Sequence, residues 1–279
     1  MYVKDCMYTT VTTVTPDTLV GKAYQMMHSE RIRHLPVVTD AQTLVGIITD
    51  RDIRRAAASD APHMAEYELT YLLDKLQVRD IMTPEVVTVH DTTPLMEAGQ
   101  IFLQKKFGCL PVVRDHNTLA GIITVTDLLR AYSTEREAYG EMIPIRNMMQ
   151  TQVITATPEM SLAEAQRLMR ANHIRHLPVM SEQRLVGMLT DRDIREAAPS
   201  PATTLARGEI TYQMEMTAVK TCMTRDVVCL GPDSDMVQAV REIVQRKIGC
   251  LPVVEQDTLV GVVTDMDCLR AFLDTASDA

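Results

Sequence analysis

The chain has no tryptophan and only three phenylalanines, so aliphatic side chains and methionine must fill its core. Its 19 methionines suit that role because the thioether side chain adapts to irregular gaps. Basic residues are not in excess: the net charge of −9 argues against a nucleic-acid binder, since a phosphate backbone requires a basic face. No apolar run approaches the ~20 residues that cross a bilayer, and the N-terminus lacks a signal-peptide pattern. We therefore expect neither a nucleic-acid nor a membrane partner.

Motifs for catalysis and for disulfide or zinc chemistry are missing as well. The six cysteines include no CxxC pair, which predicts small apolar residues in a reducing compartment and a cytoplasmic protein. No GxxxxGK[ST], GxSxG or HExxH motif occurs. Because no nucleophile–base pair repeats either, we do not expect an enzyme.

What the chain does have is a fourfold internal repeat. RHLPVV at 33–38 returns as GCLPVV at 108–113, RHLPVM at 175–180 and GCLPVV at 249–254. Each is followed by a glycine-led strand that runs into a helix: GIITDRD, GIITVTD, GMLTDRD and GVVTDMD, beginning at Gly46, Gly121, Gly187 and Gly261. A repeat of this kind indicates a fold built from four copies of one unit, so it takes precedence over local features in predicting the fold.

The four copies alternate in type, which indicates a duplicated pair. The first and third share RHLPV and TDRDIR, whereas the second and fourth share GCLPVV. The sequence predicts one module at 1–132 (copies at about 1–57 and 78–132), a linker at 133–147, and a second module at 148–279 (copies at about 148–198 and 219–273).

Each copy reads as a βαββα unit of α/β (α+β) class. In the first copy, Val11–Val14 predicts a strand, a helix follows from Leu19, and a strand at Leu44–Thr49 leads into a helix from Asp50. Ser161 with Glu164 has the spacing of a capping box, and Thr93 before Pro94 suits an N-cap and first helical position. One copy is too small to bury its sheet, so copies must pack in pairs.

The LPVV strand, the Gly-hydrophobic-hydrophobic-Thr-x-x-Asp signature and an IMTP-like start at Ile81–Pro84 resemble the cystathionine-β-synthase (CBS) domain, in four copies over nearly the whole chain. Residues 68–84 and 209–224 resemble the spacer helix of paired CBS domains. The resemblance implies two pseudo-twofold pairs (Bateman modules), stacked as a disc within one chain or completed by a homodimer. It also implies that clefts between copies bind AMP, ADP or ATP, or in some relatives S-adenosylmethionine, dinucleotides or Mg²⁺, and report ligand state to a partner protein that the sequence does not identify.

The candidate nucleotide site lies where a strand ends and a helix begins, because a helix N-terminus favours an anion. In the family the aspartate of the signature accepts the ribose hydroxyls, which assigns that role to Asp52, Asp127, Asp193 and Asp267. The threonines three residues earlier offer a hydroxyl to phosphate or sugar: Thr49, Thr124, Thr190 and Thr264. The alternative is that threonine and aspartate serve only as helix caps.

Basic residues distinguish the copies. The residue before the aspartate, which often contacts phosphate in the family, is Arg51, Arg192, Thr126 or Met266. The strand pairs Arg33–His34 and Arg175–His176 would grip phosphate as basic pairs do in the γ subunit of AMP-activated kinase. These arginines could instead pair with nearby carboxylates, and the histidines could be structural.

The carboxylates of Asp50, Asp191 and Asp265 beside the proposed phosphate site must either point away or share a bridging divalent cation such as Mg²⁺. Two functional readings follow: a non-catalytic sensor of adenosine nucleotides, or a ligand-independent oligomerisation scaffold. A sensor of Mg²⁺, S-adenosylmethionine or a dinucleotide is a variant of the first.

Overall fold

The computed structural model describes residues 1–59, 75–139, 142–197 and 207–277. They fall into two compact units, with Met1–Asp127 in the first and Leu128–Pro199 together with Gly208–Ala279 in the second. The first unit therefore holds copy one and copy two up to Asp127, and the second holds residues 128–132 of copy two together with copies three and four. Among the described residues no helix is both long and apolar enough to cross a membrane.

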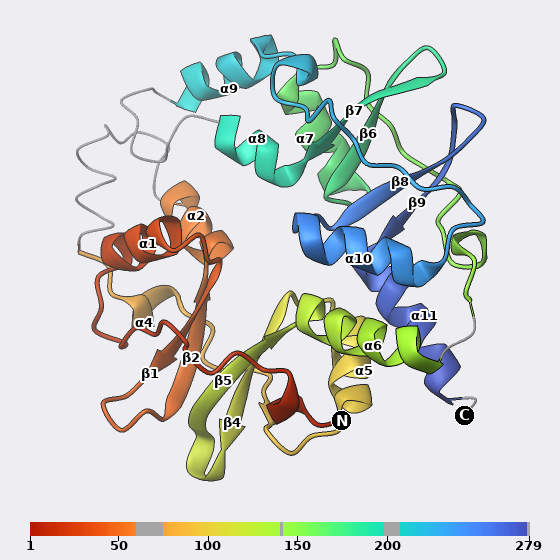
Figure 1. The fold of residues 1–279 in the computed structure, drawn as a ribbon. Helices are drawn as coiled ribbons and strands as arrows, with labels where there is room; N and C mark the ends of the chain where they lie inside the picture. Colours follow the sequence, from red (N-terminus) through yellow and green to blue (C-terminus); the bar gives the residue numbers. More distant parts are fainter. Residues whose placement is uncertain (60–74, 140–141, 198–206, 278–279) are drawn as a thin grey trace. The chain divides into compact units, whose positions relative to one another are not determined.

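Each copy contributes an antiparallel hairpin and two main helices (Figure 1), and in copies one, three and four both helices contact the hairpin strands. The elements of the first unit are α1 (Val20–Ser29), β1 (His34–Val38), β2 (Leu44–Thr49), α2 (Asp50–Ser59), α4 (Val78–Ile81), β3 (Val89–His90), α5 (Leu95–Lys105), β4 (Cys109–Arg114), β5 (Thr118–Thr124) and the start of α6 (Val125–Tyr139). Those of the second are α7 (Leu162–Ala171), β6 (His176–Ser181), β7 (Arg184–Thr190), α8 (Asp191–Ala197), α9 (Arg207–Met216), α10 (Met236–Arg246), β8 (Cys250–Glu255), β9 (Thr258–Thr264) and α11 (Asp265–Ser277). The predicted class and fourfold repeat are confirmed.

Local sequence explains where the helices begin. Ser161 caps α7, its hydroxyl accepting a hydrogen bond from the Glu164 N–H at 3.1 Å, as the spacing predicts. Leu162, Ala165 and Met169 then form the buried stripe of that helix. In α5 the prediction was wrong by one position: Pro94 is the N-cap and Leu95 the first helical residue.

The first predicted strand is nearly absent. Instead of a strand over Val11–Val14, copy one has a single parallel bridge between Val14 and Val37, and copy two has only the two-residue β3. The strand Leu44–Thr49 and the helix start at Asp50 agree with the sequence. Of the spacer helix predicted within 68–84, residues 68–74 lie outside the described residues, and the described remainder contains only the four-residue α4 (Val78–Ile81). The spacer helix predicted within 209–224 is present as α9. Residues 133–139 of the predicted linker continue α6.

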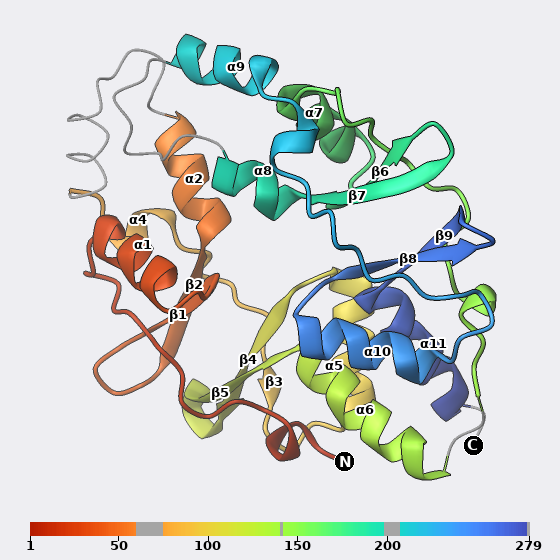
Figure 2. The same ribbon diagram turned by 45° about the horizontal axis from the view of Figure 1, so that its top comes forward.

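The copies of a pair exchange their leading segments, which we define as residues 3–8, 78–83, 145–150 and 219–224. Each forms a short turn and then hydrogen-bonds to the second hairpin strand of the other copy, through the bridges Tyr8–Ile122, Thr83–Ile47, Gln150–Val262 and Thr224–Met188. In Figure 2 the N-terminal segment runs away from α1 and alongside β4 and β5. Val78 and Val219 are accordingly buried in the cores of copies one and three.

The exchange explains the proline of the LPVV strand. Pro36 lies opposite Ile47 in the hairpin, and Ile47 directs its own N–H and carbonyl to Thr83 at 3.0 and 2.9 Å. No ladder hydrogen bond is needed from the residue opposite, so a proline costs nothing there. The other three prolines lie opposite the residue that binds a leading segment in the same way.

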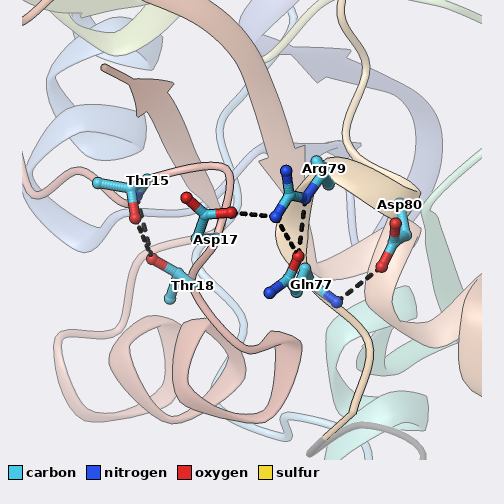
Figure 3. Close-up of polar contacts among 6 residues, drawn as sticks. All are labelled: Thr15, Asp17, Thr18, Gln77, Arg79 and Asp80. Atoms are coloured by element: carbon cyan, nitrogen blue, oxygen red, sulfur yellow. Dashed lines mark hydrogen bonds and ion pairs between the residues drawn. The ribbon is translucent and has the colours of Figure 1, made fainter. Parts of the chain in front are cut away.

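The leading segment of copy two also docks on the Pro–Asp turn of copy one. Figure 3 shows Arg79 between Asp17, with which it forms an ion pair, and the amide oxygen of Gln77, to which its Nε donates at 2.7 Å. Gln77 N–H in turn donates to the Asp80 carboxylate at 2.8 Å, and Thr15 and Thr18 share a hydrogen bond of 3.0 Å within the turn.

Candidate functional site

The strand-to-helix corners are four repetitions of one hydrogen-bonded cap. In copy one, Asp52 Oδ2 accepts from Thr49 N–H at 2.9 Å and from Thr49 Oγ1 at 2.6 Å, while Asp52 N–H lies 3.3 Å from Thr49 Oγ1. The pairs Thr124–Asp127, Thr190–Asp193 and Thr264–Asp267 repeat these bonds within 0.2 Å. The capping role considered from sequence is therefore present in every copy. It occupies the threonine hydroxyl and one carboxylate oxygen, and leaves Oδ1 as the atom that could accept from a sugar.

The corners of copies one and three keep that second oxygen. Asp52 and Asp193 are half-buried. Among the described residues, no side chain other than the capping threonine hydrogen-bonds to either carboxylate.

The corner of copy four is closed by the protein itself. Gln150, from the leading segment that pairs with Val262, places its amide nitrogen 3.3 Å from Asp267 Oδ1 and 3.2 Å from Oδ2. Asp267 is only 3% exposed. This glutamine was missed in the sequence, because nothing there shows that it reaches across from copy three.

The corner of copy two has a different neighbour from the exchanged segment. Burial raises the pKa of the Cys6 thiol in that segment, and the charges of Asp5 and Asp127 raise it further. Thr126, the predicted phosphate contact, is half-buried on the first turn of α6.

The basic strand pairs lie at the start of the strand that neighbours each corner. His34 is directly opposite Thr49 in the β1–β2 ladder, and Asp50 N–H donates to the Arg33 carbonyl at 3.2 Å. Burial lowers the pKa of His34, the Arg33 charge lowers it further, and Asp52 opposes both. In copy three His176 is likewise opposite Thr190, and Asp191 N–H donates to the Arg175 carbonyl at 2.9 Å. Arg33 and Arg175 are exposed.

Each of these histidines packs on a glycine of the other copy in its pair. A Cβ built on Gly108 would lie 3.5 Å from His34 Cε1, and one on Gly249 would lie 3.1 Å from His176 Cε1 and Nε2. Gly108 and Gly249 occupy the positions at which copies one and three carry arginine. The alternation of RHLP and GCLP thus reflects a physical fit, since the glycine of one copy makes room for the histidine of the other.

Arg51 and Arg192, which the sequence suggests as phosphate contacts, are both exposed. Arg192 Nε donates to Glu196 Oε1 at 2.8 Å along α8, in an exposed i,i+4 ion pair, while Arg51 is exposed on α2. Asp191 pairs with Arg195 at 3.4 Å rather than with a strand arginine. Arg175 instead lies near Asp265 of copy four, where it counteracts the effect of burial, which raises the pKa of that carboxyl.

Three further features bear on possible ligands. Within the described ranges, no group of three or more histidine, cysteine, aspartate or glutamate side chains could hold a metal ion. A hollow of about 410 Å³ in copy one lies between α1 and the hairpin turn, not at the corner, and its lining includes Thr15, Lys22 and Gln42. All six cysteines are free thiols.

Comparison with known proteins fits this architecture. The family profile of the CBS domain matches residues 3–59, 78–134, 145–200 and 219–274. The chain belongs to the CBS-domain family, with four copies of the domain.

Two of the similar proteins cover nearly the whole chain, and a third covers about half of it. The uncharacterized protein MJ1225 of Methanocaldococcus jannaschii is 32% identical over 271 residues, which are 94% of this chain and 95% of that protein. Its crystal structure, described as that of a candidate archaeal homologue of γ-AMPK, superposes with a TM-score of 0.77 over 98% of this chain and all of the other. A conserved protein of Pyrococcus horikoshii has the same fold, with a TM-score of 0.68 at 24% identity over 98% of this chain and all of the other. YhcV of Bacillus subtilis, a CBS-domain protein, is 31% identical over 48% of this chain and 97% of its own length.

Proposed function

We propose that this protein is a non-catalytic sensor that binds AMP, ADP or ATP at strand-to-helix corners and communicates ligand state to a protein partner. The observation that carries the proposal is the arrangement at copies one and three. A helix N-terminus and an aspartate oxygen left over by its cap lie there, beside a strand that carries an arginine–histidine pair. These groups match the anionic phosphate and the hydroxyl-bearing sugar of a nucleotide.

Each group has a defined part in this proposal. Asp52 Oδ1 and Asp193 Oδ1 accept from the ribose hydroxyls, and the capping threonines hold those carboxylates in place. Arg33–His34 and Arg175–His176 donate to phosphate. Because the exposed side chain of Arg192 forms a surface ion pair with Glu196, an exchange of that pair for phosphate costs little.

The four corners are not equivalent under this proposal. Copies one and three are the principal sites, copy two is a secondary site in which Thr126 supplies one hydroxyl, and copy four stays empty while Gln150 holds Asp267. The similarity of MJ1225 to this chain supports an adenine-nucleotide ligand through the γ-AMPK homology described for that protein.

The test is a thermal-shift and calorimetric series on the full chain with AMP, ADP and ATP, each with and without Mg²⁺. A ligand present at about 100 times its Kd adds about 2.7 kcal/mol to the free energy of unfolding. The double variant Asp52→Asn/Asp193→Asn should lose most of that gain. Asparagine preserves the shape of the cap and removes the anionic acceptor.

The matched control is Asp235→Asn. Asp235 also caps a helix, accepting from Val237 N–H at 3.2 Å, but lies at the start of α10 and not at a corner. Its variant should keep the full ligand response. If wild-type protein melts at the same temperature with and without every nucleotide, the sensor proposal is wrong and a ligand-independent scaffold is the better description.

A further inference from the structure

The two units differ in charge at one position that faces the basic pair. The residue that opens the second helix is an aspartate in copies one and three, so Asp50 and Asp191 contribute equally to both units. In copy two the corresponding residue is Val125, which is 4% exposed, whereas in copy four it is Asp265. Only the second unit therefore carries this additional carboxylate.

The Asp265 carboxylate shares one small space with the basic pair of copy three. A Cβ built on Gly249 would lie 3.9 Å from Asp265 Oδ2 and 3.1 Å from His176 Nε2, so both groups border the same point. Arg175 acts on Asp265 as its largest stabilising charge, and Asp265 Oδ1 also accepts from Met266 N–H at 2.8 Å. In the first unit, His34 supplies the only described atoms within 4 Å of the equivalent point on Gly108.

The Asp265 carboxylate thus already interacts with Arg175 and His176, and it would repel an anion that approaches them. A like charge within about 4–6 Å of a bound phosphate in a partly desolvated site weakens its binding by about tenfold or more. The neighbouring position reinforces the contrast. The first unit has Thr126, which can donate a hydrogen bond to phosphate, while the second has Met266, whose thioether has no donor for phosphate and packs on apolar or aromatic groups.

We propose that the two units select different adenosine compounds. The first unit prefers 5′-phosphorylated adenosine. In the second unit Asp265 weakens the phosphate contact of Arg175 and His176, so that unit still accepts nucleotides but prefers adenosine whose 5′ substituent is uncharged or cationic, such as a thioether or a sulfonium. This inference rests on the proposed function and adds that one chain compares two chemically distinct ligands.

The experiment uses full-length variants in which one unit is silenced. Asp52→Asn/Asp127→Asn leaves only the second unit, and Asp193→Asn/Asp267→Asn leaves only the first. Each is titrated calorimetrically with AMP, 5′-methylthioadenosine and S-adenosylmethionine. The second-unit reporter should bind one of the two sulfur compounds at least about tenfold more tightly than AMP, and the first-unit reporter should show the opposite order.

The decisive variant adds Asp265→Asn to the second-unit reporter, which should then bind AMP about tenfold more tightly. The matched control is Asp257→Asn, which removes the same charge from the exposed β8–β9 turn of the same copy and should leave all affinities unchanged. Equal ligand preference in the two reporters, or no gain of AMP affinity from Asp265→Asn, overturns the inference and leaves the sensor function standing. Absence of binding by every adenosine compound to wild-type protein overturns both.

Discussion

Gly121→Ala tests the exchange of leading segments most directly. A methyl group at this position would lie 2.7 Å from the Tyr8 carbonyl oxygen and 3.0 Å from Met7 Sδ. The sulfur can move, but the carbonyl belongs to a backbone bridge, in which Tyr8 N–H donates to Ile122 O at 2.8 Å and Ile122 N–H donates to Tyr8 O at 2.9 Å. The substitution must therefore displace the N-terminal segment from copy two. Gly121 has no positive φ, so strain of the alanine backbone does not contribute.

The expected cost follows from these contacts. Overfilling a packed site costs about 1–3 kcal/mol, and loosening two backbone hydrogen bonds costs about 1 kcal/mol each. If the segment moves away, the steric overlap is relieved but the hydrogen bonds weaken. The cost of overfilling and the cost of the lost hydrogen bonds therefore do not simply add. We expect a net loss of about 2–3 kcal/mol, which lowers the midpoint of the first unit by about 5–10 °C.

Differential scanning calorimetry of the full chain measures the shift, and hydrogen exchange at Tyr8 and Ile122 reports the local opening. Gly231→Ala is the control, since its nearest atom is Ser234 Oγ at 3.8 Å and the added methyl enters open space. That variant should stay within about 0.5 kcal/mol of wild type. If Gly121→Ala melts together with Gly231→Ala and retains protection at Tyr8, the close approach of the N-terminal segment to β5 is wrong.

Three other outcomes follow from the structure. Ser161→Ala should lose about 1 kcal/mol in urea unfolding, whereas Ser161→Thr keeps the α7 cap. Burial raises the pKa of Asp265, so the folded state binds more protons than the unfolded chain. The free energy of unfolding therefore falls as the pH rises from the ordinary aspartate pKa to the pKa in the folded state. Denaturation curves from pH 4 to 7 should show that Asp265→Asn flattens this decline. Burial raises the pKa of Cys250 to about 12, so iodoacetamide at pH 8 should label it only in denatured protein, as mass spectrometry can show.

Much of the fold could be predicted because the repeat reports each element four times. The strand Leu44–Thr49 and the helix start at Asp50 are set by local pattern and capping, and both agree with the structure. The strand predicted at Val11–Val14 was wrong. Its β-branched residues favour an extended backbone, but a strand also needs a partner, and among these four residues only Val14 forms a bridge, to Val37. The prediction of Thr93 as the N-cap of α5 was wrong because the helix begins one residue later, with Pro94 as the N-cap.

The candidate site was predictable where its residues are close in sequence. Thr49 and Asp52 meet through one helical turn, and His34 reaches them through a short hairpin. The contact of Gln150 with Asp267 arises only because a segment of copy three crosses to copy four, and no local pattern encodes that. The glycine opposite each histidine did leave a signal, since arginine in one copy type always corresponds to glycine in the other.

Because Val78 completes the interior of copy one and Val219 that of copy three, neither repeat is a self-sufficient folding element. A fragment that ended after residue 59 would have an incomplete core, because the leading segment of copy two would be missing. The same would hold for any single repeat that is moved into another protein. Recombination, truncation and chimera design should therefore respect the doublet, since it is the smallest piece of this molecule that carries all the parts of its own interior.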